Sequence, residues 1–311
     1  MSSPNLSFIK MHGLGNDFVM VDCLDGVPLP IEQMPALSTA VCDRNFGVGA
    51  DGLILVLPDD NADFRMRMWN PDGSESEMCG NGIRCFGKLL FDKGLVGASA
   101  SGVSASGENT ISVATTKGLQ RIEILAEGAQ PGASEIRVRV DMDIPHLKRS
   151  EIPMTPIAGG NDAQVINQPL QVGANEYSIT GVSMGNPHVV IFVDDVESVA
   201  LKEIGLEIEH HQSFPERTNV HFVQVLGPQK LWMRTWERGA GDTLACGTGA
   251  CAVVVASALT DQLKNTERRA LVHLPGGDLD VEWAQNNHVY MTGPATTVFE
   301  ATLHANFVKN I

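Results

Sequence analysis

The chain has 311 residues, which fits two domains of roughly 100–200 residues each better than one small hydrophobic core. Hydrophobic residues make up 43% of the chain and charged residues 19%, so disorder is excluded as its overall state. The 37 acidic and 22 basic residues leave a net charge of −15. This charge repels phosphate, and we therefore expect neither nucleic acid nor an anionic membrane as a partner.

The sequence predicts a cytoplasmic protein. Its most apolar run, Ala250–Leu259, is well short of the ~18 residues that suggest a membrane span. The first ten residues lack the charged-then-apolar pattern of a signal peptide. Six cysteines in such a chain are expected to be free thiols. Because none of them forms a Cys-x-x-Cys pair, we expect neither structural zinc nor thioredoxin-type redox chemistry.

The first half of the chain is predicted to form strands followed by one helix. The strands are short β-rich runs separated by Gly, Pro and Asn, at Phe8–Lys10, Phe18–Val21, Leu53–Leu57 and Arg65–Trp69. A helical stretch, Ile83–Lys93, comes directly after Cys79-Gly80-Asn81-Gly82. Residues 95–110 are rich in Gly, Ser and Ala and are expected to form a flexible loop.

The second half repeats this order. A helical stretch at Ala250–Gln262 follows predicted strands at Val189–Val193, Val220–Val225 and Leu231–Trp236. This helix is apolar on every face and must be buried on all sides, so we place it inside a curved sheet. Its valine run is also compatible with a strand, but the length and the glycine-rich entry favour a helix. A strand-like tail follows at Thr296–Leu303.

Two cysteines occupy matching positions in the two halves. Trp69 precedes Cys79 by ten residues and Trp236 precedes Cys246 by ten, each cysteine opening a Cys-Gly-x-Gly pattern. The second copy lies 167 positions after the first. A second repeated motif, Gly-Asn, lies upstream in each half and has nearly the same separation, at Gly15-Asn16 and Gly185-Asn186. These offsets predict two copies of one folding unit.

A thiol at the start of a helix is suited to acid–base chemistry. The free N–H groups and the dipole of the first turn lower a thiol pKa from its usual ~8.5, and they also bind anions. Two such helix ends facing each other would hold one carboxylate, with a sulfur on each side of the adjacent carbon. That arrangement removes a proton from one face and delivers one to the other, provided that one group is thiolate and its partner thiol.

The alternative for Cys79 and Cys246 is that they are buried packing residues, which is the usual role of free cysteine. The duplicated spacing favours the catalytic interpretation. The other four cysteines match no such pattern and are assigned to packing: Cys23, Cys42, Cys85 and Cys251.

At these residues the chain resembles the diaminopimelate epimerase family, and the resemblance extends over essentially its whole length. One Cys-Gly-x-Gly alone would be weak, but nine blocks occur in the order of the family. They are Met11–Phe18, Asp43–Gly52, Trp69–Ser74, Met78–Cys85, Gly185–His188, Arg217–Val220, Trp236–Gly239, Cys246–Cys251 and Met291–Gly293.

The resemblance implies an isomerase that converts LL- to meso-diaminopimelate without a cofactor, by a two-base thiol mechanism, in lysine and peptidoglycan precursor biosynthesis. It implies an α/β (α+β) fold of two pseudo-repeated domains, each a barrel-like, mainly antiparallel sheet around a central helix, with the active site in the cleft between them. The domains would be residues 1–140 with 294–311, and residues 141–293. The resemblance also implies a homodimer.

Carried over residue by residue, Cys79 is the proton donor and Cys246 the proton acceptor, while His188 and Glu237 tune the two thiols. The backbone N–H groups of four residues would hold the reacting carboxylate: Gly80, Asn81, Gly247 and Thr248. The remaining substrate contacts would come from Asn16, Asn70, Asn186, Asn219, Glu237 and Arg238. An asparagine reads a zwitterion well because it both donates and accepts, although Asn70 also fits a turn before Pro71.

One departure and two alternatives stay open at this point. Gly52 stands where many family members carry a substrate-facing glutamine. A proline or hydroxyproline racemase or epimerase would use the same pair of thiols on a substrate that has no second zwitterionic end. A non-catalytic, thiol-containing small-molecule binder would keep the scaffold without the reaction.

Overall fold

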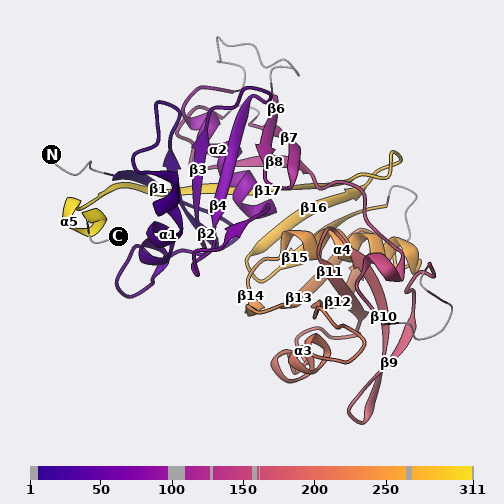
Figure 1. Ribbon diagram of the computed structural model, residues 1–311. Coiled ribbons are helices and arrows are strands. Elements are labelled where there is room, and N and C mark those ends of the chain that lie inside the picture. Colours follow the sequence, from indigo (N-terminus) through magenta and orange to yellow (C-terminus); the bar gives the residue numbers. More distant parts are fainter. Residues whose placement is uncertain are drawn as a thin grey trace. The chain divides into compact units, whose positions relative to one another are not determined.

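The computed structural model in Figure 1 describes residues 6–96, 109–126, 129–155, 160, 162–263 and 268–309. Most of the loop expected at 95–110 lies outside the described residues. The chain divides into two compact units, Met1–Val140 with Gly293–Ile311 as unit 1, and Asp141–Thr292 as unit 2. The boundary at Val140 lies near the end of one strand, Glu135–Asp141, and the boundary at Gly293 lies within another, Val289–Leu303. No helix among the described residues is long and apolar enough to cross a membrane.

Unit 1 is a ring of strands closed by hydrogen bonds. Strands β2 and β3 pair in parallel, as do β4 and β6, and the other neighbours in the order β17-β1-β2-β3-β4-β6-β7-β8 that have a defined register are antiparallel. β8 pairs with β17 and completes the ring. The strands are β1 (Leu6–Gly13), β2 (Asn16–Asp22), β3 (Gly52–Leu57), β4 (Phe64–Trp69), β5 (Glu75–Ser76), β6 (Thr110–Thr115), β7 (Gly118–Leu125), β8 (Glu135–Asp141) and β17 (Val289–Leu303).

Helix α2 (Gly80–Asp92) contacts β1, β2 and β7 and is buried along almost its whole length. Outside the ring, α1 (Met34–Cys42) follows a short 3-10 turn, Ile31–Gln33, and packs on β3. β3 is buried on both sides because its alternate residues face the two helices. Leu53 and Leu55 join the α1 cluster, whereas Ile54 reaches Gly82 of α2. A last helix, α5 (Ala305–Lys309), follows β17.

Unit 2 repeats the pattern with later segments. Strands β11 and β12 pair in parallel, as do β13 and β15, and the other neighbours in the order β9-β10-β11-β12-β13-β15-β16-β17 are antiparallel. The segment after β8 bonds to Val289 of β17 and to Ser183 of β10. The strands are β9 (Gln168–Val172), β10 (Asn175–Ser183), β11 (Pro187–Phe192), β12 (Asn219–Gly227), β13 (Lys230–Glu237), β14 (Gly241–Thr243), β15 (Arg269–Leu274) and β16 (Gly277–Trp283).

The central helix of unit 2 is α4 (Gly247–Leu259), and strands of the same unit surround it in Figure 1. It contacts β10, β11, β12, β15 and β16, and every residue from Ala250 to Ser257 is buried. Helix α3 (Leu201–Glu209) packs on the outer side of β12 and β13, and a 3-10 turn, Arg149–Glu151, lies earlier in the unit. The prediction of a buried helix inside a curved sheet is confirmed.

Both central helices begin three residues earlier than the sequence predicted. Glycine lowers helix propensity, and the Cys-Gly-x-Gly entry therefore resembled a loop. In the structure Gly82 and Gly249 lie in the first turn because neighbouring side chains leave no room for a Cβ there. The cysteines are consequently the N-caps of the two helices, at Cys79 and Cys246.

Candidate active site

In unit 1, Cys79 is the half-buried residue that precedes the first turn of α2. Its sulfur donates to the Oδ1 of Asn16, at 3.7 Å. The first N–H groups of a helix have no partner within the helix, so the turn that begins at Gly80 presents donors beside the thiol. This end of α2 therefore offers a sulfur, a helix dipole and backbone donors together, which suits a carboxylate ligand.

Asn16 is held in one orientation by its neighbours. Its Nδ2 donates to the Oδ2 of Asp51 at 2.7 Å, and its Oδ1 accepts from the Nδ2 of Asn81 at 3.0 Å. The guanidinium of Arg84 donates in turn to the Oδ1 of Asn81 at 2.9 Å and to the carbonyl of Gly80 at 3.3 Å. Unit 1 thus places Cys79, Asn16 and Asn81 together, with a buried positive charge behind them.

Sequence reasoning missed Arg84, which is completely buried. Its Nε also donates to the carbonyl of Pro294 on β17, at 3.1 Å. One turn later, Lys88 is equally buried and pairs with Asp92. Charged residues are rarely buried without a partner, so their presence on a helix inside a ring was a signal for a polar contact there.

Asn70 occupies a turn in unit 1. Its Nδ2 donates to the Oγ of Ser74 at 3.0 Å, and its N–H donates to the carbonyl of the same residue. A side chain on Gly52 would meet the Cε of Met68 at 2.8 Å and the carbonyl of Trp69 at 3.1 Å. A glutamine at this position would therefore require Met68 to move.

In unit 2, Cys246 is buried at the start of α4 and lies 3.8 Å from the Oγ1 of Thr248. Burial raises the pKa of this thiol well above its ordinary value, and the negative charge of Glu237 adds to the effect. The N–H of Gly249 and the hydroxyl of Thr248 act in the opposite direction, because hydrogen bonds to sulfur favour the thiolate. The neutral thiol is the favoured form here.

Several of the predicted residues of unit 2 are joined by hydrogen bonds. The Nε2 of His188 lies 2.9 Å from the Oδ1 of Asn186, whose Nδ2 donates to Thr248 at 3.4 Å. Asn219 donates from Nδ2 to the carbonyl of Pro187 at 2.9 Å. Asn186 therefore links the buried histidine to the first turn of α4.

Glu237 is the last residue of β13, Arg238 follows it, and the two differ in exposure. The hydroxyl of Thr243 donates to Glu237 at 2.5 Å. Arg238 is exposed, and its side chain donates to the carbonyl of Glu216 at 3.0 Å. Its backbone N–H donates to the Oδ1 of Asn219, also at 3.0 Å. The Glu237 carboxylate also accepts a hydrogen bond from the Cys246 thiol, whereas the guanidinium of Arg238 reaches solvent.

Sequence reasoning also missed His221, a fully buried residue of β12. Its Nε2 lies 2.8 Å from the Nδ1 of His188, and its Nδ1 lies 2.9 Å from the Oγ1 of Thr235. Strand alternation could have identified it, because Val220 and Phe222 face the α3 side and the residue between them must face α4.

The two histidines and Cys246 are a group of described residues whose ligand atoms lie within 4.8 Å of one another, which invites comparison with a metal site. The two facing nitrogens are only 2.8 Å apart. Nitrogens that share a tetrahedral zinc are about 3.3 Å apart at ordinary Zn–N distances. The observed separation is that of a hydrogen bond, and the histidines bond to each other.

The two histidines predict that the protein loses stability in mild acid. Burial lowers the pKa of His221 from 6.5 to about 3 and that of His188 well below 6.5. Below pH 6.5 the unfolded chain therefore binds more protons than the folded one. We expect the free energy of unfolding to fall as the pH drops from 6.5 to 5, with a slope that approaches about 1.4 kcal/mol per pH unit for each histidine. Urea unfolding measures this slope.

The control for this prediction is His210→Gln, which replaces an exposed histidine and keeps the contribution of both buried histidines to the slope. His221→Gln should lower the slope by the share of one histidine. An equal slope in wild type and His221→Gln would contradict the burial argument.

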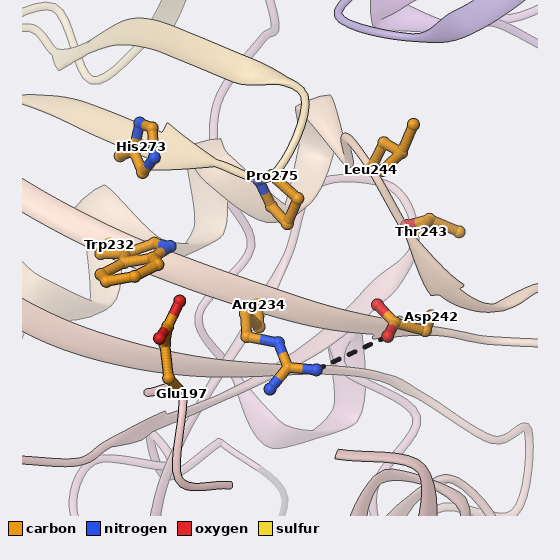
Figure 2. A pocket seen from close by; sticks show the side chains of 8 residues that line it. All are labelled: Glu197, Trp232, Arg234, Asp242, Thr243, Leu244, His273 and Pro275. Carbon is orange, nitrogen blue, oxygen red and sulfur yellow. Dashed lines mark ion pairs between the residues drawn. The ribbon is translucent and has the colours of Figure 1, made fainter. Parts of the chain in front are cut away.

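Figure 2 shows a pocket of unit 2 that contains none of the predicted residues. Two of its charged side chains form an ion pair, with the Arg234 guanidinium 3.6 Å from the carboxylate of Asp242. On another wall, Trp232 packs edge-on against His273. Thr243, also in this lining, donates to Glu237. The pocket therefore adjoins the carboxylate near Cys246, but it holds neither a thiol nor the start of a helix.

Comparison with known proteins agrees with these features. The model of the diaminopimelate epimerase family matches residues 8–147 and 180–298. The chain is 51% identical over 294 residues to the diaminopimelate epimerase of Pelotomaculum thermopropionicum, covering 94% of this chain and 97% of the relative. It is 50% identical over 296 residues to that of Moorella thermoacetica, covering 94% and 98%.

Solved structures of low identity share the fold. A hydroxyproline epimerase from Agrobacterium vitis superimposes with a TM-score of 0.66 at 14% identity, over 96% of this chain and 92% of that chain. A phenazine biosynthesis protein of the PhzF family from Bacillus anthracis gives the same TM-score at 17% identity, over 97% and 99%. The predicted two-domain fold is confirmed by this likeness. From the family match and the relatives above, the chain belongs to the diaminopimelate epimerase family.

Proposed function

We propose that this protein is an isomerase that interconverts LL- and meso-diaminopimelate without a cofactor, using Cys79 and Cys246 as its two bases. The observation that carries the proposal is the duplicated placement of the thiols, each at the N-cap of a central helix. Both helices are enclosed by the same arrangement of strands. A reaction that needs equivalent groups on opposite faces of one carbon matches this duplication.

In the direction from LL to meso, Cys246 takes the α-proton and Cys79 delivers one to the opposite face. Negative charge develops on the α-carbon and its carboxylate during this step, and backbone donors aimed at the carboxylate stabilise it. The donors are the N–H groups of Gly80, Asn81, Gly247 and Thr248.

Substrate binding prepares Cys246 for its role as a base. Glu237 raises the pKa of this thiol, after the larger effect of burial, and so keeps it protonated. An ammonium group of the substrate placed beside Glu237 offsets that charge and favours the thiolate. The side chains that place the rest of the substrate are Asn16, Asn70, Asn186, Asn219 and Arg238.

The test is incorporation of deuterium from solvent. The reduced protein is incubated with LL-diaminopimelate in deuterated water, with no pyridoxal phosphate present. Deuterium should enter the α-position as the meso isomer forms, because the delivered proton comes from a thiol that exchanges with solvent. If neither label nor meso isomer appears, the protein is a binder on this scaffold and the proposal fails.

A proline-type racemase is the second candidate, favoured only by the fold shared with the hydroxyproline epimerase. Arg238→Ala separates the two, because a cyclic amino acid has no distal carboxylate for a guanidinium to bind. For diaminopimelate we expect kcat/KM to fall roughly 10–100-fold, the equivalent of one charge-assisted hydrogen bond. Arg137→Ala, which removes an exposed arginine of β8, is the control. Unchanged kinetics in Arg238→Ala would contradict diaminopimelate as the substrate.

We place the enzyme in the cytoplasm as a homodimer, on the family resemblance. Sedimentation equilibrium should give twice the mass of one chain. A monomer of full activity would contradict this assembly.

A further inference from the structure

We infer that His221 and Thr235 are positioning residues, which set the hydrogen-bond polarity of a chain of side chains that ends on the Cys246 sulfur. This inference rests on the proposed function, since it treats Cys246 as one of the two bases. It concerns two residues outside the set predicted from the sequence.

The chain of contacts is continuous from β13 to α4. Thr235 lies 2.9 Å from the Nδ1 of His221, and the Nε2 of His221 lies 2.8 Å from the Nδ1 of His188. The Nε2 of His188 lies 2.9 Å from the Oδ1 of Asn186. The final links, given above, run from Asn186 to Thr248 and from Thr248 to the sulfur.

The amide of Asn186 decides the direction in which this chain donates. Its Oδ1 faces the Nε2 of His188, so that nitrogen must carry the proton. A neutral histidine has one N–H, and the Nδ1 of His188 is therefore an acceptor. His221 then donates from Nε2, which leaves its own Nδ1 to accept from the hydroxyl of Thr235.

The same polarity continues toward the sulfur. The Nδ2 of Asn186 donates to the Oγ1 of Thr248, so the hydroxyl proton of Thr248 is free to point at Cys246. A donor aimed at sulfur favours the thiolate. Burial keeps both histidines neutral, which is the condition that the tautomer assignment requires.

Unit 1 provides an internal comparison. His221 opposes Thr235 in the antiparallel register of unit 2, and Ile54 opposes Met68 at the same place in unit 1. The ring of His221 covers Gly249 in the first turn of α4, as Ile54 covers Gly82 in α2. By the same comparison of strand registers, His188 of unit 2 corresponds to Phe18 of unit 1.

All three polar members of unit 2 are thus apolar in unit 1. The fold therefore does not need polar groups at these positions, because its other copy packs without them. Unit 1 places Arg84 behind its thiol instead, and the matching position of α4 is Cys251. The duplicated units accordingly give the two cysteines different surroundings, a cation behind Cys79 and a neutral polar chain beside Cys246.

The tautomers can be observed directly by 15N NMR of the histidine side chains in the full-length enzyme. Neutral histidines that carry the proton on Nε2 have a distinct pattern of nitrogen shifts. We expect this pattern for both His188 and His221 at pH 7.5. A proton on Nδ1 of either ring would overturn the inference, whatever the activity of the protein.

Two variants of equal length test the effect on catalysis. His221→Gln keeps an N–H close to the position of Nε2, whereas His221→Met has the same size without a donor. We expect kcat for LL-diaminopimelate to fall about tenfold in the methionine variant, the equivalent of one hydrogen bond, and to be retained within about threefold in the glutamine variant. KM should change little in both variants, because His221 is not one of the residues proposed to contact the substrate.

The pH profile separates positioning from mere packing. The charged and titratable groups near Cys246 are Glu237, Arg238, His188 and His221. Among these groups, the two variants change only the hydrogen bond between His221 and His188. The acidic limb of the rate profile should move to higher pH in His221→Met, since the chain no longer fixes the Thr248 hydroxyl as a donor to the thiolate, and stay in place in His221→Gln. Equal profiles and equal rates in the two variants would overturn the inference. Failure of deuterium incorporation in wild type would instead overturn the proposed function.

Discussion

Replacing Cys79 with alanine is expected to reduce epimerisation by about 10²–10⁴-fold, the usual contribution of a positioned acid or base. The variant should still label one isomer. In the proposed mechanism Cys246 faces the α-hydrogen of LL-diaminopimelate and can remove and return a proton on that side. LL-diaminopimelate should therefore be recovered deuterated but not inverted. Mass spectrometry with chiral separation measures both quantities.

The reciprocal variant completes this experiment. Cys246→Ala should label the meso isomer at its epimerisable centre, again without inversion, because the proposed mechanism assigns Cys79 to the opposite face. Cys251→Ala is the control: this buried thiol lies one turn further along α4, and its loss should leave the labelling pattern intact. If the two catalytic variants label the opposite isomers, the assignment of donor and acceptor is wrong. If either variant inverts its substrate at the wild-type rate, the two-base mechanism is wrong.

The second large effect is expected from Gly249→Ala. Glycine to alanine inside a helix usually stabilises by roughly 1 kcal/mol. Here the added methyl would overlap the ring of His221, with the Nε2 at 2.9 Å and the Cys246 sulfur at 3.0 Å. The ring cannot turn away, because hydrogen bonds hold both of its nitrogens. We expect the free energy of unfolding to fall by about 1–3 kcal/mol, together with loss of activity.

Gly82→Ala is the matched control in the other unit. Its methyl would meet the Cδ1 of Ile54 at 2.8 Å, and this atom is the flexible end of a side chain. The neighbour can rotate, so the loss should be smaller than in Gly249→Ala. Urea unfolding of the two variants compares them directly. Equal stability of Gly249→Ala and wild type would show that the His221 ring is not held rigidly against α4.

The fold was largely predictable because its signals are local. Strand β3 could be predicted from its short run of apolar residues, which includes Ile54 and Val56. Helix α4 could be predicted from its apolar residues on every face. The helix starts were not predictable, because glycine ordinarily breaks a helix. Only the close approach of Ile54 and His221 explains glycine in those first turns.

The candidate site was predictable in part for a similar reason. The cysteines stand in a conspicuous repeated pattern, whereas Arg84 and His221 stand alone in apolar stretches. A buried arginine or histidine is stable only if a partner satisfies it, and that partner lies far away in the sequence. For Arg84 the partners include Pro294, and for His221 they include His188.

The amino-acid order by itself determined that the chain contains two copies of one unit and that each copy carries one Cys-Gly-x-Gly pattern, since duplication preserves spacing along the chain. Only the tertiary structure decided which side chains surround each thiol. Strand pairing brings together residues from β11, β12, β13 and α4 beside Cys246, and the corresponding strands bring apolar residues to the same places near Cys79. Hydrogen bonds between separate elements depend on that pairing, and no local pattern of residues encodes them.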